Sequence, residues 1–327
     1  GPVYDTLGDV EIEGALVPLI QIPVETTYPT EGALDMLTVN VRGNPDSPLS
    51  WFEIGAAYFD RSRAIVPVEA VYPVGVTVEE STEAGRVQME TSQQEAIAAA
   101  LSNLDYEFDA TLTVAETTDG GPSDGVLQAG DIVLTVNGEE FADVAGLRDA
   151  IAANGTSTPA DVVYERDGEE LTAEITPVLS EGDDAIAIIG VIVGSEYNFP
   201  VDVKIQLENV GGPSAGMMFA LGIIDKLTPG PINGGHQVAG TGTISATGDV
   251  GPIGGIQQKM YGAKDAGADF FFAPVENCDE VVGNTPKDLT VYAIDNLNDA
   301  LVALASIRGG LSGAGLPSCT DQSAPTE

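Results

Sequence analysis

The stretch that decides the fold is Gly211-Gly-Pro-Ser-Ala-Gly216, which joins a predicted strand, Val201 to Leu207, to a predicted helix, Ser214 to Leu227. Outward from it, β-branched runs alternate with segments whose apolar residues recur at helical spacing. The further expected elements are strands at 186–193, 241–245 and 270–273 and helices at 255–266 and 296–307. This alternation predicts an α/β (α+β) fold for the second half of the chain.

The first hundred residues also favour strands. Three β-branched runs, at 16–23, 35–41 and 65–71, are bounded by Gly, Pro and Asn, and an Ala-rich helix is expected at 93–104. Three short strands cannot form a stable core alone, so we expect them to pair with the later sheet. The predicted organisation is residues 1–106 packing with a domain at 179–309, a separate domain at 107–178 inserted between them, and a flexible tail at 310–327.

The separate domain at 107–178 is centred on Ala129-Gly-Asp-Ile-Val-Leu-Thr-Val-Asn-Gly138. Gly130-Asp131 predicts a tight turn before a buried strand, and Asn137-Gly138 predicts a type I′ turn, which needs positive φ at both residues. A helix at 143–154 and a second hairpin turn at 166–168 follow. This order resembles a bacterial PDZ domain, a mostly-β module inserted here into another domain. The resemblance implies binding of peptide termini, which add a strand to an exposed sheet edge.

Two side chains in the second half are suited to covalent chemistry. Ser214 stands at a predicted helix start, where small neighbours admit a substrate backbone and amide N–H groups can hold an oxyanion. The simpler alternative is that it caps the helix. On the next helix, which begins near Gly255, Lys259 falls on the same stripe as Ile256 and Met260. Burial lowers a lysine pKa, as a general base for a serine requires, whereas most lysines reach the surface.

Three phrases together resemble the proteolytic domain of Lon proteases. They are the Gly-Pro-Ser-Ala-Gly phrase with Ser214, Gly251-Pro-Ile-Gly-Gly-Ile-Gln-Gln-Lys259 and Ala239-Gly-Thr-Gly-Thr-Ile244. The resemblance covers about residues 186–307 and implies a fold like domain 2 of ribosomal protein S5. It also implies a Ser–Lys dyad of Ser214 and Lys259, with Thr241 as the hydroxyl that orients the lysine.

With its PDZ-like segment, the chain resembles the small Lon-like serine proteases of peptidase family S16, called YlbL-type, which lack the ATPase module. Neither glycine-rich phrase is a phosphate loop, because no Gly-Lys-Ser/Thr triplet follows it. The resemblance implies an ATP-independent endopeptidase for unfolded or exposed polypeptide segments, with no cofactor and no metal. Gly211 stands where ATP-dependent members have an aspartate, so any gating by that acid is absent.

The charge composition narrows the classes of partner that the chain can bind. The chain has 12 Lys and Arg against 51 Asp and Glu, a formal net charge of −39, which argues against nucleic acid as a partner. Its only histidine, His236, lies in a predicted loop, and a Ser-His-Asp triad built on it is the less favoured alternative to the dyad.

Localisation follows mainly from the resemblance. Gly1-Pro2 looks like the remnant of a cleaved tag, and no apolar run reaches the roughly 20 residues that span a membrane. The resemblance implies one N-terminal membrane anchor, missing from this chain, with the catalytic part outside the cytoplasm. Cys278 and Cys319 are either a disulfide or two free thiols, and an oxidising compartment favours the disulfide. The sequence leaves open whether the chain forms a homo-oligomer. The alternative function is a catalytically silent PDZ-containing scaffold at the membrane surface.

Overall fold

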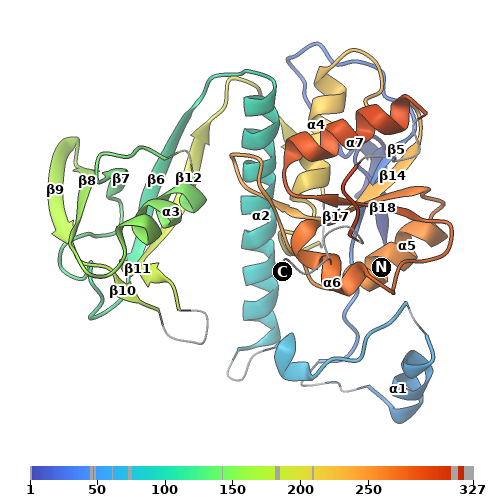
Figure 1. Cartoon of the computed structure of the whole chain (residues 1–327), viewed down its shortest axis with the longest axis horizontal. Coiled ribbons are helices and arrows are strands. Elements are labelled where there is room, and N and C mark those ends of the chain that lie inside the picture. Colours follow the sequence, from blue (N-terminus) through green and yellow to red (C-terminus); the bar gives the residue numbers. More distant parts are fainter. Residues whose placement is uncertain are drawn as a thin grey trace, which may run out of the picture. The chain divides into compact units, whose positions relative to one another are not determined.

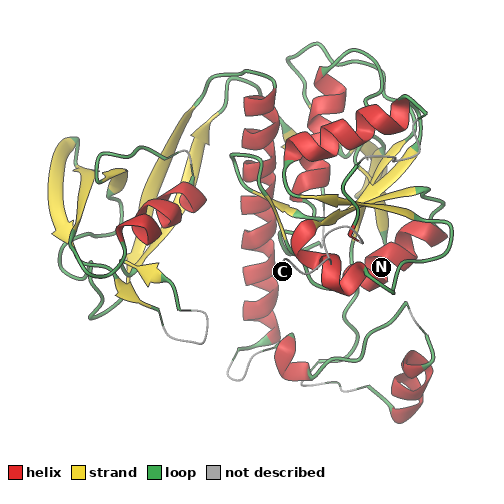
Figure 2. Ribbon diagram, in the orientation of Figure 1, coloured by secondary structure: helices red, strands yellow, loops and turns green. Residues whose placement is uncertain are grey.

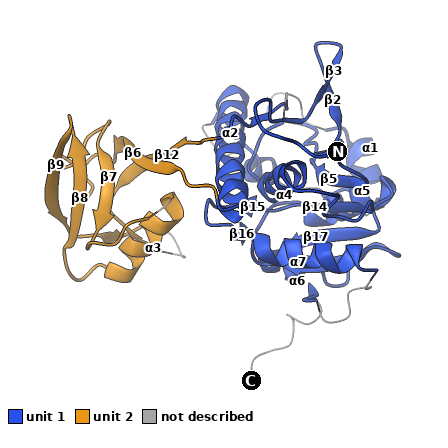
Figure 3. Cartoon of the chain, turned by 90° about the horizontal axis from the view of Figure 1, so that it is seen from above, with its two compact units in different colours: residues 1–105, 201–327 blue, residues 106–200 orange. Residues whose placement is uncertain are grey.

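The computed structural model describes residues 2–44, 47, 49–60, 62–72, 76–141, 143–180, 185–207, 210–310 and 316–319. Most of the predicted flexible tail, 310–327, therefore lies outside the described residues. The chain divides into two compact units, one formed by residues 1–105 and 201–327 and the other by residues 106–200 (Figure 3). The second unit is thus inserted into the sequence of the first.

Unit 1 is organised around one mixed sheet whose strand order is β1-β5-β14-β17-β18 (Figure 1). The strands are β1 (Val3–Asp5), β5 (Ala33–Leu37), β14 (Gln237–Gly240), β17 (Phe270–Pro274) and β18 (Thr290–Ile294). β14 runs parallel to both β5 and β17. The prediction that N-terminal strands pair with the later sheet therefore holds for the run at 35–41, which overlaps β5, whereas the run at 16–23 pairs outside this sheet.

Six helices of unit 1 are described, and Figure 2 shows them in red. They are α1 (Trp51–Tyr58), α2 (Val78–Asn103), α4 (Gly216–Leu227), α5 (Ile256–Asp265), α6 (Cys278–Val281) and α7 (Leu297–Arg308). α4 is buried continuously from Gly216 to Asp225, and α2 packs against it. α2 begins at a capping box in which Thr77 and Glu80 satisfy each other's backbone N–H groups. It is much longer than the helix predicted at 93–104.

Short strands and turns complete unit 1. They are β2 (Asp9–Ile12) with β3 (Ala15–Pro18), β4 (Ile20–Gln21) with β13 (Lys204–Ile205), β15 (Thr243–Ile244) with β16 (Val250–Gly251), and the 3-10 turns Val68–Ala70 and Val275–Asn277. The strand predicted at 65–71 is wrong. Pro67, which cannot donate to a strand ladder, instead begins the turn Val68–Ala70. Among the described residues, no helix has the length and apolar character needed to cross a membrane.

Unit 2 contains an antiparallel sheet with the order β12-β6-β7-β8-β9. Its elements are β6 (Asp109–Thr117), β7 (Ile132–Val136), α3 (Val144–Asn154), β8 (Ala160–Arg166), β9 (Glu169–Ile175), β10 (Val178–Leu179), β11 (Ala187–Ile188) and β12 (Val191–Asn198). The predicted turn is confirmed, because φ is 53° at Asn137 and 77° at Gly138. Buried Asp131 also receives a bidentate ion pair from Arg166, with Nη2–Oδ2 at 2.6 Å, which ties β8 to the turn before β7.

The boundary expected at residue 179 needs correction. β12 pairs along the whole of β6, from Val191 opposite Thr117 to Asn198 opposite Asp109. The β-branched run at 186–193 was expected to open the catalytic domain, but it lies in unit 2, where residues 187–188 form β11, paired with β10, and β12 begins at Val191. A β-branched run suits either sheet, so the sequence alone did not separate the two assignments.

Candidate active site

Ser214 lies in the turn before α4 and is partly exposed. α4 has Ala215 as its N-cap, with no side-chain capping bond, so Ser214 is not the helix cap. The backbone carbonyl of Ser214 accepts hydrogen bonds from the N–H of Gly242 at 3.0 Å and from Oγ1 of Thr241 at 2.9 Å. The turn is therefore fixed while the side chain of Ser214 is left for other contacts.

Lys259 comes from the first turn of α5 and points into the protein. It is 1% exposed, and its Nζ lies 2.7 Å from Oγ of Ser214 and 2.8 Å from Oγ1 of Thr241. α5 starts at Gly255, whose φ of 74° is a left-handed conformation that suits glycine. The predicted inward direction of Lys259 is therefore observed, and the side chain does not reach the surface.

Thr241 follows the last residue of β14 and is 1% exposed. Its N–H bonds the carbonyl of Phe272 on β17 at 3.1 Å, so its position depends on the central sheet. Because the Thr241 hydroxyl donates its proton to the Ser214 carbonyl, its oxygen is left as an acceptor for Nζ of Lys259. The structure thus brings together the three side chains that the sequence singled out.

The environment of Lys259 makes its neutral amine more accessible than that of a lysine in water. Burial lowers the pKa of Lys259 from 10.5 to about 8, because the ammonium loses its hydration inside the protein. An amine with that pKa is partly unprotonated near neutral pH, and its lone pair can then accept a proton from Oγ of Ser214.

Two glycines let the end of β14 approach the turn at Ser214. A Cβ at Gly240 would lie 2.6 Å from Sδ of Met218, and one at Gly242 would lie 2.7 Å from Cγ1 of Val250. Either side chain would push Thr241, which lies between them, away from its partners. The small residues of this phrase therefore serve packing around the hydroxyl.

A cavity of about 150 Å³ opens beside Ser214. Its lining combines apolar side chains, among them Met36, Leu37 and Met89, with the polar residues Thr38 and Asn40. The cavity therefore offers both apolar and polar contacts next to the serine hydroxyl.

The alternative triad is not assembled. His236 is exposed and precedes β14, with its ring against Phe270 at 5.8 Å between centroids, whereas Thr241 follows the other end of that strand. The strand separates the two positions by about 16 Å. Within the described part of the chain, no three His, Cys, Asp or Glu side chains are grouped so as to hold a metal ion.

Two supporting residues were missed at the sequence level. Asn277 receives the N–H of Ile253 and donates to its carbonyl, both at 2.9 Å, which fixes the loop before α5. Ser92 on α2 donates to the carbonyl of Pro213 at 2.9 Å. Neither belongs to a recognisable phrase, and a polar residue inside an otherwise apolar helix face was the only available signal for Ser92.

Comparison with known proteins agrees with this geometry. Residues 208–306 match the family model of the Lon protease (S16) C-terminal proteolytic domain, and residues 74–176 match a PDZ domain model. Lon protease 2 of Herpetosiphon aurantiacus is 35% identical over 108 residues, which are 31% of this chain and 13% of that protein. The Lon protease of Clostridioides difficile is 27% identical over 179 residues, which are 51% of this chain and 22% of that protein.

A solved PDZ domain, from an SdrC-like protein of Listeria monocytogenes, is 21% identical and covers 25% of this chain and 85% of its own, with a TM-score of 0.24. The chain spans less than a quarter of the length of the two Lon proteases named above. The two family matches follow one another along the sequence, and the Lon match contains both Ser214 and Lys259. The chain therefore contains a segment that matches the Lon protease (S16) proteolytic domain, residues 208–306, and a segment that matches a PDZ domain, residues 74–176.

Proposed function

We propose that the chain is an ATP-independent serine endopeptidase in which Ser214 is the nucleophile and Lys259 the general base. The observation that carries this proposal is the 2.7 Å separation between Nζ of Lys259 and Oγ of Ser214, with the lysine almost completely buried. A nucleophile within hydrogen-bond reach of a base, itself oriented by a third group, is the arrangement that covalent catalysis requires.

The reaction proceeds in two halves. Neutral Nζ of Lys259 takes the proton from Oγ of Ser214 as that oxygen attacks the scissile carbonyl carbon, and the carbonyl oxygen becomes an oxyanion. The ammonium then gives the proton to the leaving amine as the peptide bond breaks, which leaves an acyl-enzyme. Water attacks the acyl-enzyme with Lys259 again as base, and Ser214 is regenerated. Throughout, Thr241 accepts one N–H of the lysine and so directs its lone pair at Ser214.

The substrate is an unfolded or exposed polypeptide segment. No step above consumes a nucleotide, and a backbone must be extended to reach a serine in a turn. The cavity beside Ser214, lined by both apolar and polar residues, can receive a substrate side chain next to the scissile bond. The net charge of −39 additionally attracts cationic segments.

Unit 2 would recruit polypeptide termini. β12 is an edge strand of its sheet and packs beside α3. An extended peptide can add to such an edge through backbone hydrogen bonds, with side chains lying along the helix.

The proposed location is outside the cytoplasm, at the membrane, through an N-terminal anchor. The disulfide between Cys278 and Cys319 supports the extracytoplasmic part of this proposal, since disulfides persist mainly in oxidising compartments.

The test is hydrolysis of casein without ATP by the wild type, Ser214→Ala and Lys259→Ala. Both variants should lose activity. Lys264→Ala is the matched control, because Lys264 lies on the same helix but donates to the carbonyl of Asp288 and should be dispensable. Equal residual rates in wild type and Ser214→Ala would instead favour the catalytically silent scaffold.

A further inference from the structure

Helix α2 supports the turn that carries the nucleophile. Ser92, 3% exposed, donates from Oγ to the carbonyl of Pro213 at 2.9 Å. The N–H of Gly216 also donates to this carbonyl, but over a longer distance of 3.4 Å. A Cβ at Gly216 would lie 2.9 Å from Oγ of Ser92, so the absence of a side chain there allows the approach.

A second contact lies two helical turns away on the same face of α2. The N–H of Gly212 donates to the carbonyl of Gly85 at 2.8 Å. A Cβ at Gly211 would lie 3.1 Å from the carbonyl carbon of Gly85, so the two backbones are in close contact. Residues 85 and 92 share one face because seven residues make about two turns. Residues 211–213 are therefore held along one side of α2.

The contact of Ser92 controls the direction of a second group. A trans peptide unit is planar, so the carbonyl of Pro213 and the N–H of Ser214 point in opposite directions. The carbonyl points at α2, and the N–H consequently points away from it. This N–H makes no hydrogen bond to any residue that the structure describes. It is therefore an available donor beside the nucleophile.

We infer that Ser92 is a positioning residue that aims the N–H of Ser214 at the oxyanion formed during hydrolysis. This inference rests on the proposed function. Donors aimed in advance stabilise developing charge best, because no reorganisation accompanies the reaction. Ser92 does not line the cavity beside Ser214, and it acts only through the peptide unit that joins Pro213 to Ser214.

A purely structural role for Ser92 makes different predictions. Loss of the hydroxyl leaves a partly buried carbonyl with a weaker partner, which lowers stability whatever the role of Ser92. Rates must therefore be measured well below the unfolding temperature and divided by the number of active sites. A serine-directed fluorophosphonate counts those sites by labelling Ser214.

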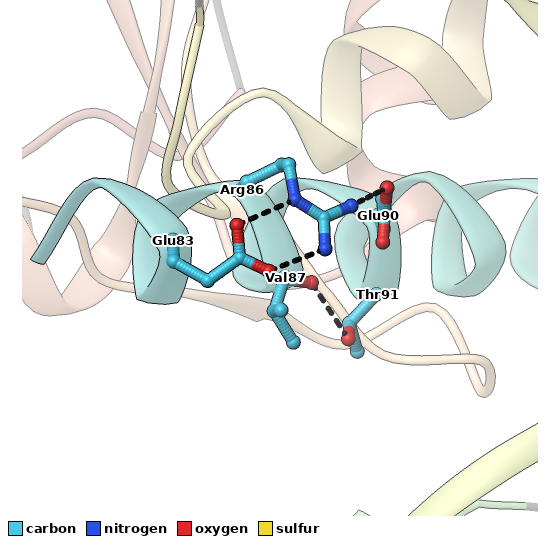
Figure 4. A network of polar contacts seen from close by, with 5 residues as sticks. All are labelled: Glu83, Arg86, Val87, Glu90 and Thr91. Carbon is cyan, nitrogen blue, oxygen red and sulfur yellow. Dashed lines mark hydrogen bonds and ion pairs between the residues drawn. The ribbon is translucent and has the colours of Figure 1, made fainter. Parts of the chain in front are cut away.

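The experiment compares wild type, Ser92→Ala and Thr91→Ala. Thr91 is the matched control, since its hydroxyl bonds the carbonyl of Val87 within α2 and lies on an exposed face with the ion pairs of Arg86 (Figure 4). The measurements are kcat and KM for a peptide substrate, the pH midpoint of kcat/KM, and the affinity of a peptide boronate, which forms a tetrahedral adduct with serine.

Ser92→Ala should lower kcat and boronate affinity together by about tenfold, less than the 10²- to 10³-fold cost of deleting an oxyanion donor. KM and the pH midpoint should stay as in wild type and Thr91→Ala. A second variant, Gly211→Ala, should lower kcat while leaving α2 intact, because its Cβ would push the turn off Gly85.

A per-site kcat for Ser92→Ala within twofold of wild type would overturn the inference, as would a loss confined to KM or a moved pH midpoint. These outcomes differ from failure of the proposed function, in which the wild type itself neither hydrolyses the peptide nor is labelled at Ser214.

Discussion

The titration of Lys259 gives the sharpest test of the dyad. Its pKa is lowered by burial from 10.5 to about 8. At pH 7 a group with a pKa of 8 is about 10% neutral, whereas a group with a pKa of 10.5 is only about 0.03% neutral. The lowered pKa therefore supplies on the order of a few hundred times more neutral amine at pH 7.

The expected profile of kcat/KM therefore rises about tenfold per pH unit below pH 7 and levels off above about pH 9, since kcat/KM reports the free enzyme. The profile is measured from initial rates between pH 6 and 10, at constant ionic strength, with a peptide substrate that has no titrating groups. Lys259→Arg keeps a charge but cannot lose its proton, so it should abolish the alkaline activity.

A pH-independent rate would refute the assignment, and so would a midpoint near 10.5. Substantial activity in Lys259→Arg would refute it as well. Thermal unfolding at each pH shows whether the protein stays folded across the range.

Three further changes have defined outcomes. Thr241→Val removes the acceptor that favours the ammonium of Lys259, so the midpoint of kcat/KM should move to lower pH and the plateau should fall less than in Lys259→Ala. Asp35 is buried opposite Asp5 on the paired strand, and burial raises its pKa to about 6. Its protonated form therefore contributes stability that is fully present below about pH 4, and this contribution is lost as the pH rises through 6. Asp35→Asn should therefore raise the free energy of unfolding in urea by up to about 3 kcal/mol at pH 7.5 and by nothing near pH 4, and equal stability at pH 7.5 would contradict this. Cys319→Ser opens a disulfide that closes 41 residues and should cost up to about 4 kcal/mol, seen as a lower melting temperature that reductant no longer changes.

The side chains of the candidate site could be predicted because each belongs to a local sequence pattern. Ser214 and Lys259 stand in glycine-rich phrases at helix starts, and the orientation of Lys259 follows from helical periodicity within a few residues. The turn at Asn137 was predictable for the same reason, since two adjacent residues determine its type.

The supporting contacts were not open to prediction, because they join distant parts of the chain. Ser92 and Pro213 are 121 residues apart, and no local pattern relates a serine on one helix to a carbonyl beyond an inserted domain. The same limit applies to Asn277 and Ile253. β12 was misassigned because its apolar alternation fits any sheet edge, and only its pairing with β6 decides the domain to which it belongs.

The pairing of β6 with β12 also affects how the active site assembles while the chain folds. Asp109 and Asn198 are directly opposite each other, so the ends of the insert lie about 5 Å apart once this ladder has formed. Counted through that shortcut, the path from Ser92 to Pro213 shrinks from 121 residues to roughly 30. The entropic free-energy cost of closing the loop then falls by about 1 kcal/mol. Early formation of the β6–β12 ladder would thus speed the arrival of the nucleophile's turn on its supporting helix, with the inserted domain acting as a kinetic aid to the domain that it interrupts.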